Sequence, residues 1–265
     1  MAQFKQSIQV CKIFLLKESK KIKNYCIIVI AAVAIGMYME PTIEYSKMVG
    51  YKLALWIFPF IMATRELRLV VYTCFVFLIT SSMSDNNIFY EICIRTKVST
   101  YRVGKILCIT ILSMIYTFFI ATIGVCMYIP YFRYEKGWGK VLYSITEYAI
   151  EGNVMNTLVG RRKILQELTP VSGMLLEGLA VFLTCFLIGL VLYYFSQIIQ
   201  CRQIGILICS ILIMLDFASE GPLFEYTLLL MSPLSWSNLN LVKIKKYMNT
   251  PSVWLCFILG FFTKA

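Results

Sequence analysis

Residues Ser84–Lys105, SDNNIFYEICIRTKVSTYRVGK, form a polar stretch between two apolar runs that are each long enough to cross a bilayer. Basic side chains follow the acid Glu91, and the stretch ends in the pair Gly104–Lys105, where the next apolar run begins. A short basic segment between two apolar runs is typical of the cytoplasmic face of a membrane. We therefore expect a short helix over residues 84–102 on that face, placed to contact a partner.

The composition indicates an integral membrane protein. Of the 265 residues, 59% are hydrophobic and only 15% are charged, which is too little polar side chain to cover a soluble globule of this size. Each crossing needs roughly 20 apolar residues, and each should be a complete helix because the bilayer interior offers no water to the backbone. The sequence predicts an all-α protein with six transmembrane helices, over residues 25–39, 67–83, 103–130, 171–199, 204–218 and 252–262.

Basic residues set the expected orientation. They are denser in the segments 1–24, 84–102 and 200–203 than in the segments between the other span ends, so these three segments are predicted to be cytoplasmic. Both termini are then predicted to be cytoplasmic, and the protein to lie in the cell membrane of a bacterium. The net charge of +11 is explained by this bias and by attraction to anionic membrane lipids, and no nucleic-acid partner is expected.

The first 24 residues precede the first predicted span. Apolar positions recur among them at helical spacing, between lysines, at Phe4, Ile8, Cys11, Leu15 and Ile22. The pattern predicts an amphipathic helix in the plane of the lipid headgroups. The alternative is an uncleaved basic flank of the first span.

Several kinds of chemistry are excluded by residue type. The chain has no histidine, which removes imidazole metal sites and histidine-activated nucleophiles. The pairs Gly104–Lys105 and Gly139–Lys140 lack the upstream glycine and the following Ser or Thr of a phosphate-binding loop. No catalytic residue, metal site or cofactor is therefore predicted in this chain, and ATP and Mg²⁺ would have to bind to a partner. The ten cysteines avoid the predicted outer loops, which argues against a disulfide framework.

Two carboxylates, Glu177 and Asp216, lie inside predicted spans, within about two turns of the outer ends. Acids in such positions are costly and by default mark function. They are candidates for a substrate or proton path. The alternative is that they reach headgroups or water, or hydrogen-bond to each other.

The predicted outer segments suggest structural elements and not reactive sites. Residues Leu53–Met62 are apolar but too short to span, and indicate a re-entrant or interfacial helix or an extension of the second span. Trp56, Trp236 and Trp254 are placed as interfacial anchors. The loop 131–170 is long enough for a small helical cap, and a solvated connector is the alternative.

The overall pattern resembles the permease subunits of type-2 ABC transporters, the exporter-like family with six spans per subunit. The features that carry the resemblance are the amphipathic N-terminal helix, the acid Glu91 followed by a basic cluster and Gly104–Lys105, and the stretch Ser232–Trp236. The chain departs from the family in its long outer loop, in the segment between the first two spans and in its short sixth helix.

The resemblance implies an ATP-driven exporter in which a coupling helix docks into a separate ATPase subunit, and a second permease subunit completes the transporter. The docking residues would come from the coupling helix and from a smaller contact between the fourth and fifth spans: Ile88, Phe89, Tyr90, Glu91, Arg95, Lys97, Arg102, Gln200 and Arg202. A hydrophobic or amphipathic cargo, such as a peptide, is expected. Two rival functions stay open: a secondary transporter that uses Glu177 and Asp216, and a membrane sensor or scaffold.

Overall fold

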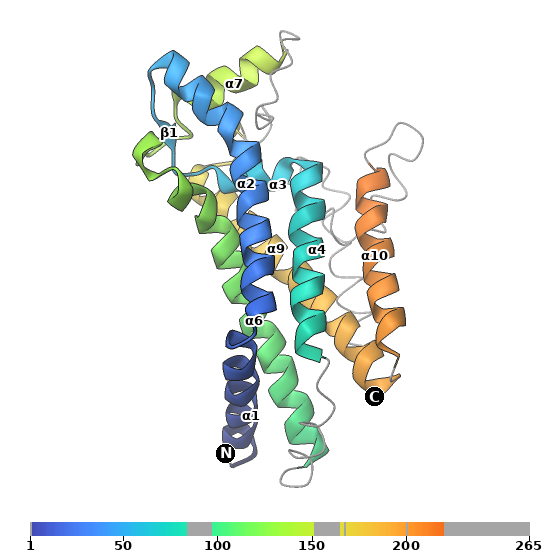
Figure 1. Ribbon diagram of the computed structural model, residues 1–265. Coiled ribbons are helices and arrows are strands. Elements are labelled where there is room, and N and C mark those ends of the chain that lie inside the picture. Colours follow the sequence, from blue (N-terminus) through green and yellow to red (C-terminus); the bar gives the residue numbers. More distant parts are fainter. Residues whose placement is uncertain (1, 84–96, 151–164, 167, 200, 220–265) are drawn as a thin grey trace.

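A computed structural model describes residues 2–83, 97–150, 165–166, 168–199 and 201–219 of the chain. This part is mainly helical (Figure 1). Its helices are α1 (Ala2–Ser19), α2 (Ile22–Val49), α3 (Phe58–Ala63), α4 (Arg65–Met83), α6 (Val98–Met127), α7 (Lys140–Ile150), α9 (Pro170–Tyr193) and α10 (Arg202–Ser219). Two short helical turns, η1 (Ile129–Tyr131) and η2 (Tyr194–Ile198), and two short strands, β1 (Leu53–Ala54) and β2 (Phe132–Arg133), complete it.

Three of the described helices are long and apolar enough to cross a membrane: α2, α6 and α9 with its extension to Gln197. They correspond to the first, third and fourth predicted spans. The second and fifth predicted spans are helices too, α4 and α10, and pack beside the other three (Figure 1). The sixth predicted span, 252–262, lies outside the described residues. The structure thus shows an apolar helical bundle with three candidate spans, while six crossings stay a prediction.

Local sequence explains where the long helices begin and end. α9 begins at Pro170, which suits a first helical turn because it has no N–H to leave unpaired. The side chain of Thr169 caps this helix by accepting a hydrogen bond from the backbone N–H of Ser172. α6 ends at Met127, shortly before Pro130, which cannot continue the helical hydrogen bonding. α2 is considerably longer than the predicted span 25–39 and runs on to Val49.

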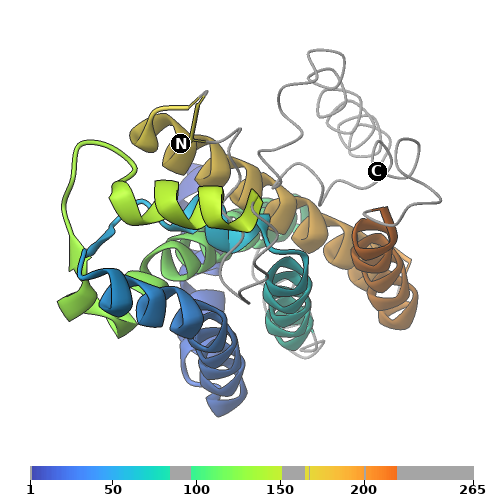
Figure 2. The ribbon, with the colours of Figure 1, turned by 90° about the horizontal axis from the view of Figure 1, so that it is seen from above.

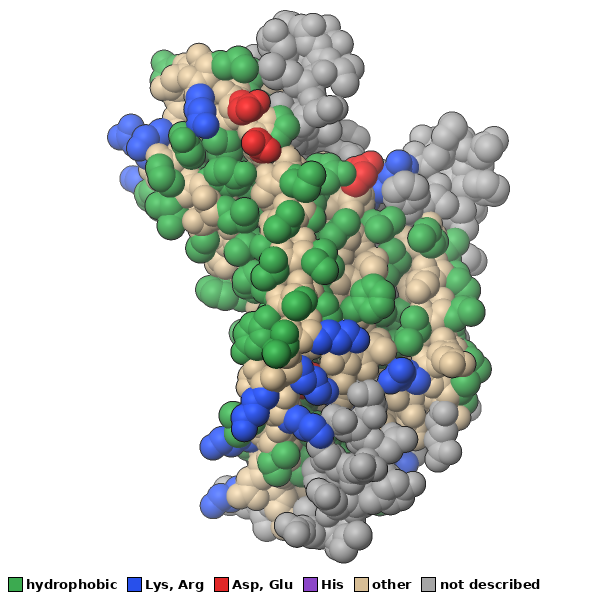
Figure 3. Space-filling model, viewed as in Figure 1, with side chains coloured by type: hydrophobic (Ala, Val, Ile, Leu, Met, Phe, Trp, Pro, Cys, Tyr) green, Lys and Arg blue, Asp and Glu red, His purple; other side chains and the backbone are tan. Residues whose placement is uncertain are grey.

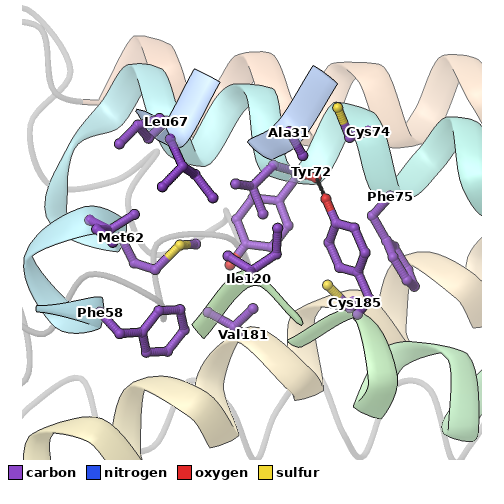
Figure 4. Packing of buried hydrophobic residues seen from close by; sticks show 14 of the residues in the cluster. Ala31, Phe58, Met62, Leu67, Tyr72, Cys74, Phe75, Ile120, Val181 and Cys185 are labelled. Atoms are coloured by element: carbon purple, nitrogen blue, oxygen red, sulfur yellow. Dashed lines mark hydrogen bonds between the residues drawn. The ribbon is translucent and has the colours of Figure 1, made fainter. Parts of the chain in front are cut away.

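The core lies between α2, α3, α4, α6 and α9. Tyr72 of α4, Ile120 of α6 and Val181 of α9 lie near one another in this core, and all three side chains are buried (Figure 4). The hydroxyl of Tyr116 on α6 donates a hydrogen bond to the backbone carbonyl of Val71, 2.7 Å away. Because this bond leaves α6 and ends on α4, it ties the two helices together inside the bundle.

A small cap covers the end of the bundle that is distant from α1. β1 pairs with β2 in parallel, and α7 lies across this end (Figure 2). Trp138 is buried, packs edge-on against Phe60 of α3 and donates a hydrogen bond from its indole N–H to the carbonyl of Leu168. The prediction of a helical cap within the loop 131–170 is confirmed by α7. Residues 151–164 of that loop are outside the described residues.

The apolar stretch Leu53–Met62 belongs to this cap. It forms β1 and most of α3, and every residue of α3 is buried. The expected re-entrant or interfacial helix is therefore a short helix covered by protein. The indole N–H of Trp56 donates a hydrogen bond to the carbonyl of Glu135, 2.8 Å away, so this tryptophan holds the cap together where an interfacial anchor was predicted. Trp236 and Trp254 lie outside the described residues.

The segment 1–24 is helical over most of its length, but its buried face differs from the predicted one. α1 runs alongside the first half of α6 (Figure 1), and its buried residues are Ser7, Val10, Cys11, Phe14 and Glu18. Of the predicted apolar stripe, Ile8 and Ile22 are exposed and Cys11 is buried. The buried face is the one that meets the beginning of α6, where Phe14 packs against Tyr101 and Ser7 donates a hydrogen bond to Thr100. The placement of α1 relative to lipid headgroups stays a prediction.

Charged side chains are unevenly distributed along the molecule. On the face seen in Figure 3, apolar side chains cover the middle of the bundle and basic ones gather toward the α1 end. Most acidic side chains visible there lie toward the other end. Exposed apolar residues occur on each candidate span, for example Met37, Phe118 and Leu175. An apolar belt next to a basic end is the pattern expected of a protein held in a membrane.

Candidate functional site

The α1 end of the bundle contains a tightly packed joint between three helices. Phe14 of α1 packs edge-on against Tyr101 of α6, with ring centroids 5.9 Å apart. The hydroxyl of Ser7 donates a hydrogen bond to the carbonyl of Thr100, 3.2 Å away. Cys11 and Cys108 are buried in the same apolar cluster. α1 is therefore fixed to the beginning of α6 by both apolar and polar contacts.

Gly104 allows α1 and α6 to approach each other closely. A Cβ atom at this position would lie 2.8 Å from Cγ1 of Val10 and 2.9 Å from the backbone carbonyl oxygen of Ser7. Both distances are shorter than any normal contact of a Cβ atom, and the second neighbour is backbone that cannot turn away. The glycine of the predicted Gly104–Lys105 motif is thus explained by helix packing.

Lys105 joins α6 to both neighbouring helices. Its side chain is buried, and its ammonium group donates a hydrogen bond to the carbonyl of Ser82 in the last turn of α4, 3.0 Å away. The same ammonium lies 3.6 Å from the centroid of the Phe14 ring, in a cation–π contact. A charge at this depth is stable only when it is paired with oxygen or π electrons. Lys105 consequently ties the end of α4, the start of α6 and α1 into one unit.

A second cluster of polar side chains, Glu18, Lys21 and Asn24, holds the bend between α1 and α2. The ammonium of Lys21 lies 2.7 Å from a carboxylate oxygen of Glu18 and donates to the carbonyl of Ser81, 2.8 Å away. The side-chain amide of Asn24 donates to the carbonyl and to the carboxylate of Glu18. The two groups together connect α1, α2 and α4 at one end of the bundle.

The predicted docking residues divide into described and undescribed ones. Lys97, Arg102 and Arg202 have exposed side chains. Lys97 precedes α6, Arg102 lies in its second turn, and Arg202 begins α10 at the same end of the bundle (Figure 1). The described end of the predicted coupling helix, residues 98–102, is continuous with α6. The remaining predicted docking residues lie outside the described residues: Ile88, Phe89, Tyr90, Glu91, Arg95 and Gln200.

A second site, near the cap end of the bundle, contains buried charges. The Nε atom of Arg68 on α4 lies 3.2 Å from Oδ2 of Asp216 on α10. Both side chains are almost completely buried, with exposed fractions of 1% and 5%. A guanidinium N–H of Arg68 also donates to the carbonyl of Met62, 3.4 Å away. The pair fastens α10 to α4, because separating the helices would strand two buried charges.

Glu177 of α9 lies close enough to Arg68 for the two charges to interact. Its side chain is completely buried, and neither of its carboxylate oxygens accepts a hydrogen bond from any described residue. The expectation that Glu177 or Asp216 reaches headgroups or water is wrong, because both are enclosed by protein. The partner of Asp216 is Arg68, not Glu177.

Sequence reasoning missed the role of Arg68. The available signal was the position of a charged residue one turn into the apolar helix α4, where Leu67 and Val71 on the same side are buried. Among the described residues, no group of three or more Cys, Asp or Glu side chains is arranged to hold a metal ion.

Comparisons of this chain with protein-family models, with curated proteins and with solved structures give no match. The geometry of the two sites and the pattern of the sequence therefore carry the functional argument.

Proposed function

We propose that this chain is the membrane-spanning permease subunit of an ATP-driven exporter of the type-2 ABC class, which works with a separate ATPase subunit. In this proposal the chain crosses the cell membrane six times and both termini are cytoplasmic. A second permease subunit, identical or related, completes the translocation path. The three candidate spans, the apolar belt and the basic α1 end support the membrane part of the proposal.

The observation that carries the proposal is the joint around Gly104 and Lys105. α4 ends and α6 begins at this joint, so the polar stretch that connects them leaves from it and returns to it. A partner that pulled on this stretch would move α1, α4 and α6 together, because Lys105 of α6 contacts both α1 and α4. A mechanical input from a motor protein requires such a connection between the docking segment and the spans.

The cargo in this proposal is hydrophobic or amphipathic, for example a peptide. Support comes from the character of the helix surfaces, since α4 and α6 expose aromatic side chains, Phe77 and Phe118. Other aromatic side chains of these two helices are part of the packed core. Phe75 and Tyr116 are both buried and pack with ring centroids 5.1 Å apart.

The experiment is to purify the tagged full-length chain from its natural membranes and measure co-purifying ATPase, its stoichiometry and its ATP hydrolysis. Charge reversal at Lys97 and Arg102 together should lower both association and hydrolysis about tenfold, because rim charges steer and orient a partner. Replacing Phe89, Tyr90 and Glu91 by alanine should have a similar effect.

The matched control is Lys52→Glu, which reverses an exposed charge at the opposite end of the bundle. It should leave association and hydrolysis unchanged. Absence of any co-purifying ATPase, or equal effects of charge reversal at the two ends, would refute the proposal.

A second candidate function is an ion-coupled secondary transporter, and one observation favours it. Glu177 is a buried acid with no hydrogen bond from a described residue, inside a candidate span, and acids in such positions often bind the coupling ion of a transporter. Transport that survives ATP depletion and stops on addition of a protonophore would select this function over the exporter.

A further inference from the structure

An open cavity of about 440 Å³ lies in the cap, between the turn that precedes α7 and the beginning of α9. Its lining includes two charged side chains, Glu135 and Lys140, and four aromatic or apolar ones, Trp138, Tyr143, Leu165 and Leu168. The volume falls within the usual range for small-molecule sites. Neither of the two sites described above uses this cavity.

The walls of the cavity are held in place before any ligand arrives. Trp138 is fixed by its hydrogen bond to the carbonyl of Leu168, 2.9 Å away, and Trp56 holds the backbone of Glu135. Gly139 has φ +81°, a left-handed conformation that glycine adopts without strain. A side chain there would meet the Cβ of Ala54 at 3.0 Å. A cavity with fixed walls loses little conformational entropy when a ligand binds.

Two residues of opposite charge, Glu135 and Lys140, line the same cavity. Among the described residues, Glu135 and Lys140 form no ion pair with one another. The ammonium of Lys140 lies 5.0 Å from the centroid of the Tyr51 ring, a cation–π contact that does not cancel its charge. The lining thus contains an acidic and a basic residue that are not ion-paired with each other, beside an apolar wall.

We propose that this cavity binds a small zwitterion of about dipeptide size with an apolar side chain. The carboxylate of Glu135 receives the ammonium group of the ligand, Lys140 receives its carboxylate, and Leu165, Leu168 and Trp138 contact its apolar part. Charge-assisted hydrogen bonds at both ends give the site its selectivity. The proposal goes beyond ATP-driven transport and does not depend on it.

The test uses the purified full-length chain in lipid nanodiscs, with the dipeptide Leu-Leu as the probe and calorimetry as the readout. Two blocked probes, N-acetyl-Leu-Leu and Leu-Leu-amide, each lack one of the two charges. We expect Leu-Leu to bind, and each blocked probe to bind at least about tenfold more weakly, which is a loss of about 1.4 kcal/mol.

Variants of the two charged residues separate recognition from folding. Glu135→Gln should weaken Leu-Leu about tenfold and leave N-acetyl-Leu-Leu unchanged, since that probe has no ammonium to lose. Lys140→Gln should weaken Leu-Leu and leave Leu-Leu-amide unchanged. Lys52→Gln, at an exposed position next to β1, is the matched control and should change nothing.

Failure of Leu-Leu to bind at millimolar concentration would overturn the proposal. Equal affinity for the free and blocked probes would also overturn it, because the charges would then play no part. Binding is measured on this chain alone, whereas the transport proposal is tested by a co-purifying ATPase, so the two can fail independently.

Discussion

Removing the charge of Asp216 tests whether Glu177 is a reserve partner for Arg68. The Arg68–Asp216 pair has an Nε–Oδ2 distance of 3.2 Å. At an effective dielectric constant of about 20, two unit charges at that distance attract each other by about 5 kcal/mol. Loss of one partner from a buried pair costs about 3–5 kcal/mol when the other charge is left alone.

Glu177 changes that expectation for Asp216→Asn. Because its buried carboxylate lies close to Arg68, it can compensate the guanidinium after the substitution. The single variant should then lose only about 1–2 kcal/mol of unfolding free energy. Glu177→Gln alone should be nearly neutral, since Asp216 still pairs with Arg68. The double variant should lose about 3–5 kcal/mol, because both of the carboxylates that the structure places near Arg68 are then neutral.

The assay is a double-mutant cycle on the unfolding free energy of the chain in lipid nanodiscs, with unfolding monitored by circular dichroism. Glu66→Gln is the control. Its side chain is 48% exposed, and its Oε1 atom lies 3.8 Å from Nε of Arg65. Surface pairs of this kind contribute about 0–1 kcal/mol to stability. Additivity of the two single variants within about 0.5 kcal/mol would refute the reasoning, because independent sites add within that margin.

Three further predictions concern the joint and the core. Gly104→Val should lower stability by about 1–3 kcal/mol through overpacking against α1, measured by thermal unfolding, whereas Gly178→Ala should not, since no atom lies within 4 Å of a Cβ there. Burial raises the pKa of the Cys11 thiol above its usual 9.0, although a hydrogen bond from another thiol lowers it slightly. With Cys11 as the sole cysteine, maleimide labelling should be slow near pH 7 because little thiolate is present. The labelling rate should still rise above pH 9, and it should increase when Gly104→Val loosens α1. A labelling rate equal to that of the unfolded chain would contradict this prediction. Tyr116→Phe should cost about 1 kcal/mol of unfolding free energy through the lost bond to Val71, and an unchanged unfolding midpoint would show that this bond does not stabilise the core.

Composition and apolar run length predicted the helices well. The predicted spans 67–83, 103–130, 171–199 and 204–218 each coincide closely with a described helix, because helix length and hydrophobicity are local properties of the chain. Caps and breakers explain the ends, as Thr169 and Pro170 do for α9. The length of the loop 131–170 allowed a helical cap or a solvated connector, and α7 shows that part of the loop is helical.

Partner choice was beyond the reach of local pattern. The stripe expected on the first 24 residues included Ile8, which is exposed, whereas Ser7 and Glu18 are buried. A buried face is decided by the surface that meets it, and here that surface is the beginning of α6 with its glycine. The parallel pairing of Leu53 with Phe132 joins residues far apart in the sequence, and no local signal marks it.

The sequence by itself determined that this is an apolar helical chain with a basic end, and it marked Glu177, Asp216 and Gly104–Lys105 as residues that need an explanation. Only the tertiary structure decided that Arg68 neutralises Asp216 and that Lys105 joins three helices. The reason is physical. Hydrophobicity and helix length depend on neighbours in the chain, whereas the energy of a buried charge depends on which oppositely charged or polar group the fold places within a few ångströms of it.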